Sequence, residues 1–188
     1  MYLRRVNDIL INPELAIKQA KKEKCMTTTF VVLLFEWFLI ALGLFLLLHR
    51  LNASAMLFFL GVVGTVFAGF LVQMVFTVLG GKGGYYEGVT SVVYSLLPMS
   101  ASVVLSSIFI TLPVFGVLLS FVVTVLFVLL GMTILYRAVK ELFSTDMITA
   151  MVGIGILVGG ITIALYAAFA MYAITTPNLA SYFIPAIS

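Results

Sequence analysis

The side chains that could do chemistry in this sequence are few and lie far apart. The chain has 188 residues, with one His, one Cys and seven Asp or Glu residues. Cys25 precedes the first long apolar segment and His49 follows it, so no Cys–His pair or Ser–His–Asp triad can be assembled. No group of His, Cys, Asp and Glu has the spacing of metal ligands. We therefore expect no enzyme activity, no catalytic residue, no metal site and no cofactor.

Glu36 is the most informative single residue, because it interrupts the first apolar segment. Its position places it roughly 13 Å along a helix, near the centre of a hydrocarbon core about 30 Å thick. A carboxyl group at that depth is costly, so it should face other helices. Three roles stay open: a proton-coupled transport site, an essential polar contact, or a neutral Glu that forms hydrogen bonds between two helices.

Other polar residues lie at a comparable depth in the next two apolar segments. Depth alone suggests a buried intramembrane polar site composed of Glu36, Gln73, Tyr94, Ser95 and Pro98. Pro98 removes a backbone donor and favours a kink near Tyr94. A broken helix of this kind can form a transporter's substrate site, but the same proline can simply bend the helix.

The elements that position these residues are apolar throughout. Hydrophobic residues make up 63% of the chain and charged residues only 9%, against about 45–50% and about 25% in soluble domains. We therefore predict an all-α membrane bundle. Apolar stretches of about 20 residues span a bilayer, and five occur, at about 27–48, 53–79, 89–112, 113–137 and 147–174.

The borders of these segments carry recognisable signals. Pro113 suits the first turn of the fourth span, and Thr145 or Asp146 suits the N-cap of the fifth. Residues 80–84, which include four glycines and Lys82, form a flexible connector. Gly61 with Thr65, and Gly155 with Gly159, have the four-residue spacing of helix-packing seams, either within the bundle or in a homodimer.

Basic residues predict the orientation. With the amino terminus inside, the inner segments contain nine Lys or Arg residues and the outer segments contain only Arg50. The chain thus has a cytoplasmic segment (1–26), a transmembrane domain (27–174) and a short tail (175–188), whose end is outside or lumenal. The basic charge reflects this topology and gives no reason to expect a nucleic-acid partner.

The segment before the first span combines apolar and basic residues. Asn12 and Pro13 have the order of an N-cap and a first helical residue. We expect a short amphipathic helix on the inner membrane surface, although the segment could serve only to set topology. In the first case four lysines would contact lipid headgroups: Lys18, Lys21, Lys22 and Lys24.

Several short motifs, taken in order, give the chain a family resemblance. Asn12-Pro13-Glu14 precedes the first span, and the glycine-rich segment with Lys82 separates the second and third spans. Tyr94-Ser95-Leu96-Leu97-Pro98 is similar to a Tyr-x-x-x-Pro element, and Tyr136-Arg137-Ala138 leads through Glu141-Leu142-Phe143 to Ala150. In this order the chain resembles the Yip family, integral membrane proteins named for their interaction with Ypt/Rab GTPases.

The resemblance implies a five-helix bundle with a cytoplasmic amino terminus and a role in membrane organisation or trafficking. Eukaryotic members carry a long cytoplasmic amino-terminal region and an acidic Asp-Leu-x-Gly-Pro element, and both are absent from this sequence. The chain is therefore more similar to a short prokaryotic-like member, for which a GTPase partner is not expected. The partners implied are membrane lipids, a protein partner or a second copy of the chain.

Two functional classes follow. The first is a non-enzymatic membrane protein that interacts with lipids or protein partners. The second is a small transporter or lipid-translocating protein that uses the polar residues around Glu36. A transporter needs Glu36 to titrate and a cavity to reach it, whereas an interaction protein needs neither.

Overall fold

The computed structural model describes residues 8–175, with side chains up to residue 167 apart from residue 165. The predicted tail and the first seven residues lie outside this range. The described chain is helical and contains no strand. Its long elements are α2 (Pro13–Glu23), α3 (Met26–Leu48), α4 (Leu51–Val78), α5 (Tyr85–Phe109), α6 (Gly116–Leu142) and α7 (Met147–Thr175). Five of them, α3 to α7, are long and apolar enough to cross a membrane, which confirms the predicted five-span bundle.

The third and fourth spans begin at positions other than those predicted. Helix α5 starts at Tyr85, before the apolar run, because the Glu87 carboxylate accepts a hydrogen bond from the Gly84 amide (2.9 Å) and so caps the first turn. Helix α6 starts at Gly116. Pro113 lies in the preceding turn, where Val114 has a φ of 74°, so it is not the first residue of the helix.

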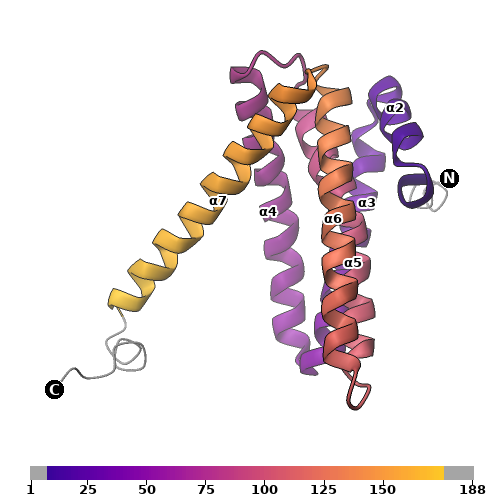
Figure 1. Ribbon diagram of the computed structural model, residues 1–188, viewed down its shortest axis with the longest axis vertical. Coiled ribbons are helices and arrows are strands. Elements are labelled where there is room, and N and C mark those ends of the chain that lie inside the picture. Colours follow the sequence, from indigo (N-terminus) through magenta and orange to yellow (C-terminus); the bar gives the residue numbers. More distant parts are fainter. Residues whose placement is uncertain (1–7, 176–188) are drawn as a thin grey trace.

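Helices α3 to α6 form the compact part of the molecule, and small residues let them approach closely (Figure 1). A Cβ on Gly61 of α4 would lie 2.1 Å from the Trp37 ring of α3, and one on Gly88 of α5 would lie 2.3 Å from the Gly69 carbonyl oxygen of α4. A Cβ on Gly131 of α6 would likewise lie 2.7 Å from the Ser95 carbonyl oxygen of α5. Close backbone approach is how membrane helices gain packing energy.

Helix α7 diverges from this bundle (Figure 1). Its first turns are packed, because Ala150 is buried and a Cβ on Gly153 would lie 2.4 Å from the Phe76 ring. Further along, a Cβ on Gly155 or Gly159 would meet nothing within 4 Å. Of the two roles open to this glycine pair, packing within the bundle is therefore not found among the described residues.

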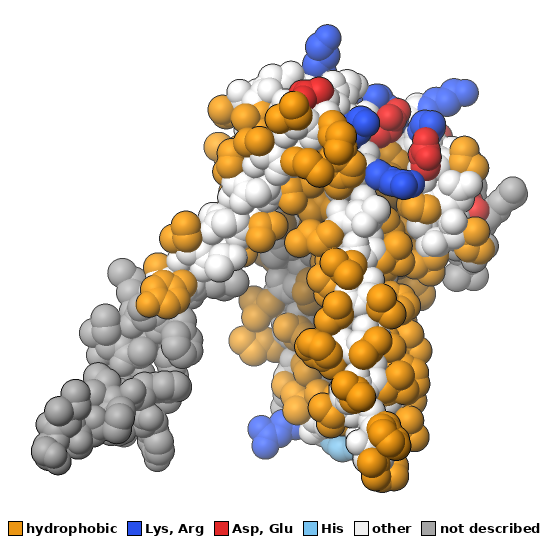
Figure 2. Space-filling model, in the orientation of Figure 1, with side chains coloured by type: hydrophobic (Ala, Val, Ile, Leu, Met, Phe, Trp, Pro, Cys, Tyr) orange, Lys and Arg blue, Asp and Glu red, His pale blue; other side chains and the backbone are white. Residues whose placement is uncertain are grey.

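Charged side chains gather at one end of the molecule (Figure 2). We call this the charged end; it comprises α2, the 80–84 connector, the start of α5, the end of α6 and the 143–146 junction between α6 and α7. The opposite end carries His49 and Arg50. Between the two ends the visible helix surfaces are mostly apolar (Figure 2), as expected for surfaces that face lipid.

Candidate functional site

Glu36 lies in the middle of the contact between α3 and α5. That contact is marked by a hydrogen bond between the hydroxyls of Thr29 and Thr90 (3.2 Å) and, further along, by Gly43 against Val103. Glu36 is seven residues from both Thr29 and Gly43, so it is level with positions 96–97 of α5. Its side chain is fully buried.

Neither carboxyl oxygen of Glu36 has a hydrogen-bond partner among the described residues. A hydrogen bond to a second helix, one of the three roles left open for Glu36, is therefore absent among the described residues. The polar contact between α3 and α4 is made by other residues. The Trp37 indole donates to the Thr65 hydroxyl (2.8 Å), which donates to the Gly61 carbonyl (2.9 Å). A buried polar group without a partner is costly and rare, so this position needs an explanation.

The other members of the predicted polar site are distributed along α5 and α4. Gln73 packs beside Gly88, roughly 13 Å along the helix axis from the level of Glu36. Tyr94, Ser95 and Pro98 are buried within three residues of that level. Ser95 lies where α5 meets Gly131 of α6. The structure therefore brings Tyr94, Ser95 and Pro98 close to the depth of Glu36 and leaves Gln73 nearer the charged end.

The serines around Pro98 bond to their own helix. Ser91 donates to the Glu87 carbonyl, Ser95 to that of Val92 and Ser100 to that of Leu97, each at 2.7 Å. Helix α5 runs without interruption through Pro98. The broken helix that would suit a transporter site is therefore not formed at Pro98.

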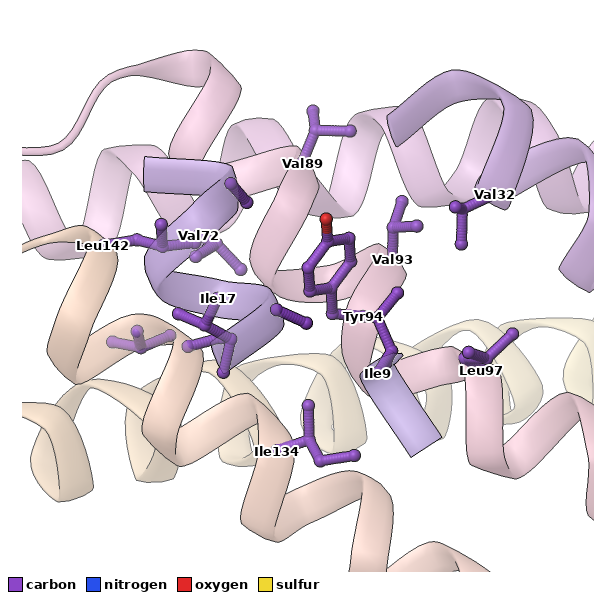
Figure 3. Packing of buried hydrophobic residues seen from close by; sticks show 14 of the residues in the cluster. Ile9, Ile17, Val32, Val72, Val89, Val93, Tyr94, Leu97, Ile134 and Leu142 are labelled. Atoms are coloured by element: carbon purple, nitrogen blue, oxygen red, sulfur yellow. The ribbon is translucent and has the colours of Figure 1, made fainter. Parts of the chain in front are cut away.

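At the charged end, helix α2 is docked against protein. Asn12 caps it by accepting a hydrogen bond from the Leu15 amide (3.5 Å), which confirms the predicted start. One face, formed by Ala16, Ile17 and Ala20, is buried. Figure 3 shows Ile17 in the same cluster as Tyr94 of α5 and Ile134 and Leu142 of α6. The apolar face of α2 thus covers the ends of two transmembrane helices.

Polar contacts hold α2 in this position. The Tyr86 hydroxyl donates to the Ala20 carbonyl (3.1 Å), and Lys24 forms an ion pair with the nearly buried Glu87 (2.8 Å). Lys21 donates to the Glu141 carbonyl and to the Ser144 hydroxyl (3.0 Å). The hydrogen bond with Glu87 raises the pKa of Lys24 above its usual value, so its ammonium group is charged at neutral pH.

Three of the four lysines assigned to lipid headgroups are therefore engaged with protein carboxylates. Lys18 pairs with Glu14 (2.9 Å), and this contact lowers the pKa of Glu14. Lys21 lies 3.9 Å from the Glu141 carboxylate, and Lys24 holds Glu87. Lys22 is exposed, and no ion pair involves it within residues 8–175.

Sequence reasoning missed Glu87 and Glu141 as partners of the basic segment. Both acids follow or precede a span by a few residues and resemble ordinary loop charges. The partner lysines lie more than 60 residues away in the sequence. No periodicity links such distant positions, so only the docking of α2 reveals these pairs.

A cavity of about 230 Å³ lies between α2 and the end of α6. Most of its lining residues are polar or charged, namely Glu14, Tyr136, Arg137, Lys140 and Glu141, and Ile17 is its apolar member. A second cavity, of about 340 Å³, lies between α3 and α4 toward the opposite end and is almost wholly apolar, with several Phe residues. Neither cavity is lined by Glu36. Of these two cavities, the charged one is better suited to bind a polar ligand.

Comparisons with known proteins give no assignment. No protein-family model, no curated protein and no solved structure matches this chain.

Proposed function

We propose that this chain is a non-enzymatic, multi-pass membrane protein that organises lipids at its charged end. The proposal includes the orientation expected from the basic residues, with the charged end in the cytoplasm. The resemblance to the Yip family agrees with such a role in membrane organisation or trafficking. The observation that carries the proposal is the docking of α2, which joins charged side chains from α2, α5 and α6 into one surface at the membrane boundary.

The docked helix gives this surface a defined shape. A free basic segment would attract anionic lipid through its net charge alone. Here Ala16 and Ala20 are buried and Tyr86 bonds to the α2 backbone. The lysine and glutamate side chains consequently stand at set positions relative to α6, and a headgroup would meet a structured site.

The test uses full-length protein in liposomes that contain spin-labelled phospholipids, and it measures the fraction of each lipid that the protein immobilises. We expect a larger immobilised fraction for phosphatidylglycerol than for phosphatidylcholine. Ala20→Arg places a charge in the buried face of α2 and should reduce that difference to what net charge alone provides, because α2 can no longer dock. Leu15→Arg adds the same charge on the exposed face and should preserve it. Equal immobilisation of both lipids by native protein would refute the proposal.

A second function, small-molecule or lipid transport, is favoured by one observation. Glu36 is a fully buried carboxyl group without a hydrogen-bond partner in the described chain, and such groups within membranes often mark transport pathways. Proton, ion and labelled-lipid flux into liposomes would decide, with Glu36→Gln as the comparison. Flux that falls in the variant would support transport, and absence of flux in both proteins would argue against it.

A further inference from the structure

The charged cavity between α2 and α6 has more cations than its carboxylates can neutralise. Its two acids are paired, Glu14 with Lys18 and Glu141 with Lys21. Its two basic residues, Arg137 and Lys140, both exposed, take part in none of the ion pairs found among the described residues. The cavity and the lysines beside it thus contain four cations and two carboxylates. The surplus of positive charge favours an anionic ligand.

The position of these cations along α6 suits a lipid headgroup. Helix α6 has 27 residues, a length of about 40 Å, which exceeds a hydrocarbon core of about 30 Å by roughly seven residues. Its first turns, from Val117 to Phe121, include large exposed apolar residues. The excess length therefore falls at the other end, so Arg137 and Lys140 lie at headgroup depth, beside Tyr136, a residue type common at that interface.

We propose that this cavity binds the phosphate group of an anionic phospholipid, with Arg137 and Lys140 as its ligands. A guanidinium can donate two parallel hydrogen bonds to phosphate oxygens, and an ammonium group adds a point charge. Glu14 and Glu141 form ion pairs with Lys18 and Lys21 and border the site. Arg137 also acts on Glu14 at longer range, but neither Arg137 nor Lys140 is held in an ion pair within the described residues, so both can turn to a phosphate. This assignment rests on the proposed function and names the ligand class for it.

The experiment is native mass spectrometry of the full-length protein, released from micelles that contain equal amounts of phosphatidylglycerol and phosphatidylcholine. We expect native protein to retain phosphatidylglycerol preferentially. Each basic residue near an anionic surface contributes roughly a fivefold preference. Arg137→Gln with Lys140→Gln should therefore lower the retention ratio by about tenfold or more.

The control removes the same charge from the same end of the molecule. Lys22 and Lys82 are exposed and do not line the cavity, so Lys22→Gln with Lys82→Gln should keep most of the preference. An equal loss in both double variants would overturn the assignment, because it would indicate general surface charge. Unchanged retention in the Arg137 and Lys140 variant would also overturn it.

The phosphate group bound in this cavity could belong to a phospholipid or to a soluble phosphate ester, and a measurement with inorganic phosphate distinguishes the two. If phosphate raises the thermal stability of native protein but not of the Arg137→Gln, Lys140→Gln variant, while neither retains phospholipid selectively, the site takes a soluble phosphate ester and the lipid assignment fails. The proposed function fails separately, when native protein in liposomes immobilises both lipids equally. If the Arg137→Gln, Lys140→Gln variant still immobilises phosphatidylglycerol preferentially, the proposed function stands and only the assignment of this cavity is refuted.

Discussion

Replacement of Glu36 by leucine should stabilise this protein. The carboxyl group is fully buried between α3 and its neighbours, and both oxygens lack a hydrogen-bond partner within the described residues. Burial of an unpartnered polar group costs about 1–3 kcal/mol on the scale of protein substitutions. Leucine removes that cost and retains most of the volume. Glu36→Gln retains an unpartnered polar group, so its stability should stay close to that of native protein.

Glu87→Leu is the matched control, because Glu87 is also buried but has partners. Its carboxylate accepts hydrogen bonds from Lys24 (2.8 Å) and from the Gly84 amide (2.9 Å). Their removal should destabilise the protein by about 1–3 kcal/mol. The same substitution at two buried glutamates should thus shift stability in opposite directions.

Thermal unfolding in detergent, followed by circular dichroism, measures both effects. A change of 1 kcal/mol corresponds to roughly 2–4 °C in Tm for a chain of this size. We therefore expect Glu36→Leu to raise Tm by several degrees and Glu87→Leu to lower it. If Glu36→Leu lowers Tm as much as Glu87→Leu does, the Glu36 carboxyl group makes an essential contact and the reasoning is refuted. A stabilised Glu36→Leu protein would indicate that Glu36 is retained for function.

Two further predictions concern close packing and helix capping. Gly61→Ala should destabilise the bundle by about 1–3 kcal/mol, because the new Cβ would lie 2.1 Å from the Trp37 ring. The control is Gly64→Ala, whose Cβ would meet nothing within 4 Å and which should leave Tm unchanged or higher. Equal losses of stability in the two variants would contradict the packing argument. Asp146→Ala should weaken the start of α7 by about 1 kcal/mol, since its carboxylate accepts from the amides of Ile148 (3.1 Å) and Thr149 (3.3 Å). Hydrogen bonds from Thr149 lower the pKa of Asp146 below its usual 3.8, so the cap's contribution is complete above that pH and is lost as the pH falls through the lowered value. Hydrogen exchange of these two amides at neutral and acid pH measures the effect, and a difference between native protein and variant that persists in strong acid would refute it.

Much of the helical architecture follows from local sequence signals. Apolar segments long enough to cross a bilayer predict the five spans, and the structure confirms them, because lipid requires each segment to satisfy its own backbone hydrogen bonds. Asn12 and Asp146 cap helices as predicted, since an N-cap depends on contacts within one turn. The start of α6 was placed three residues too early, because Pro113 suits a turn as well as a first helical residue.

Tertiary structure decided which residues meet. Hydropathy gives the depth of a residue but not the side of the helix on which it lies or the neighbour that it faces. Depth therefore grouped Gln73 with Glu36, while the packing of α4 against α5 places Gln73 beside Gly88. Likewise, the apolar and basic pattern of the amino-terminal segment predicts that Lys24 contacts lipid headgroups, whereas the docking of α2 pairs it with Glu87. Apolar helices have similar surfaces, so the sequence by itself determined the spans and their caps, and close contacts between helices determined the lateral arrangement that forms the charged cavity.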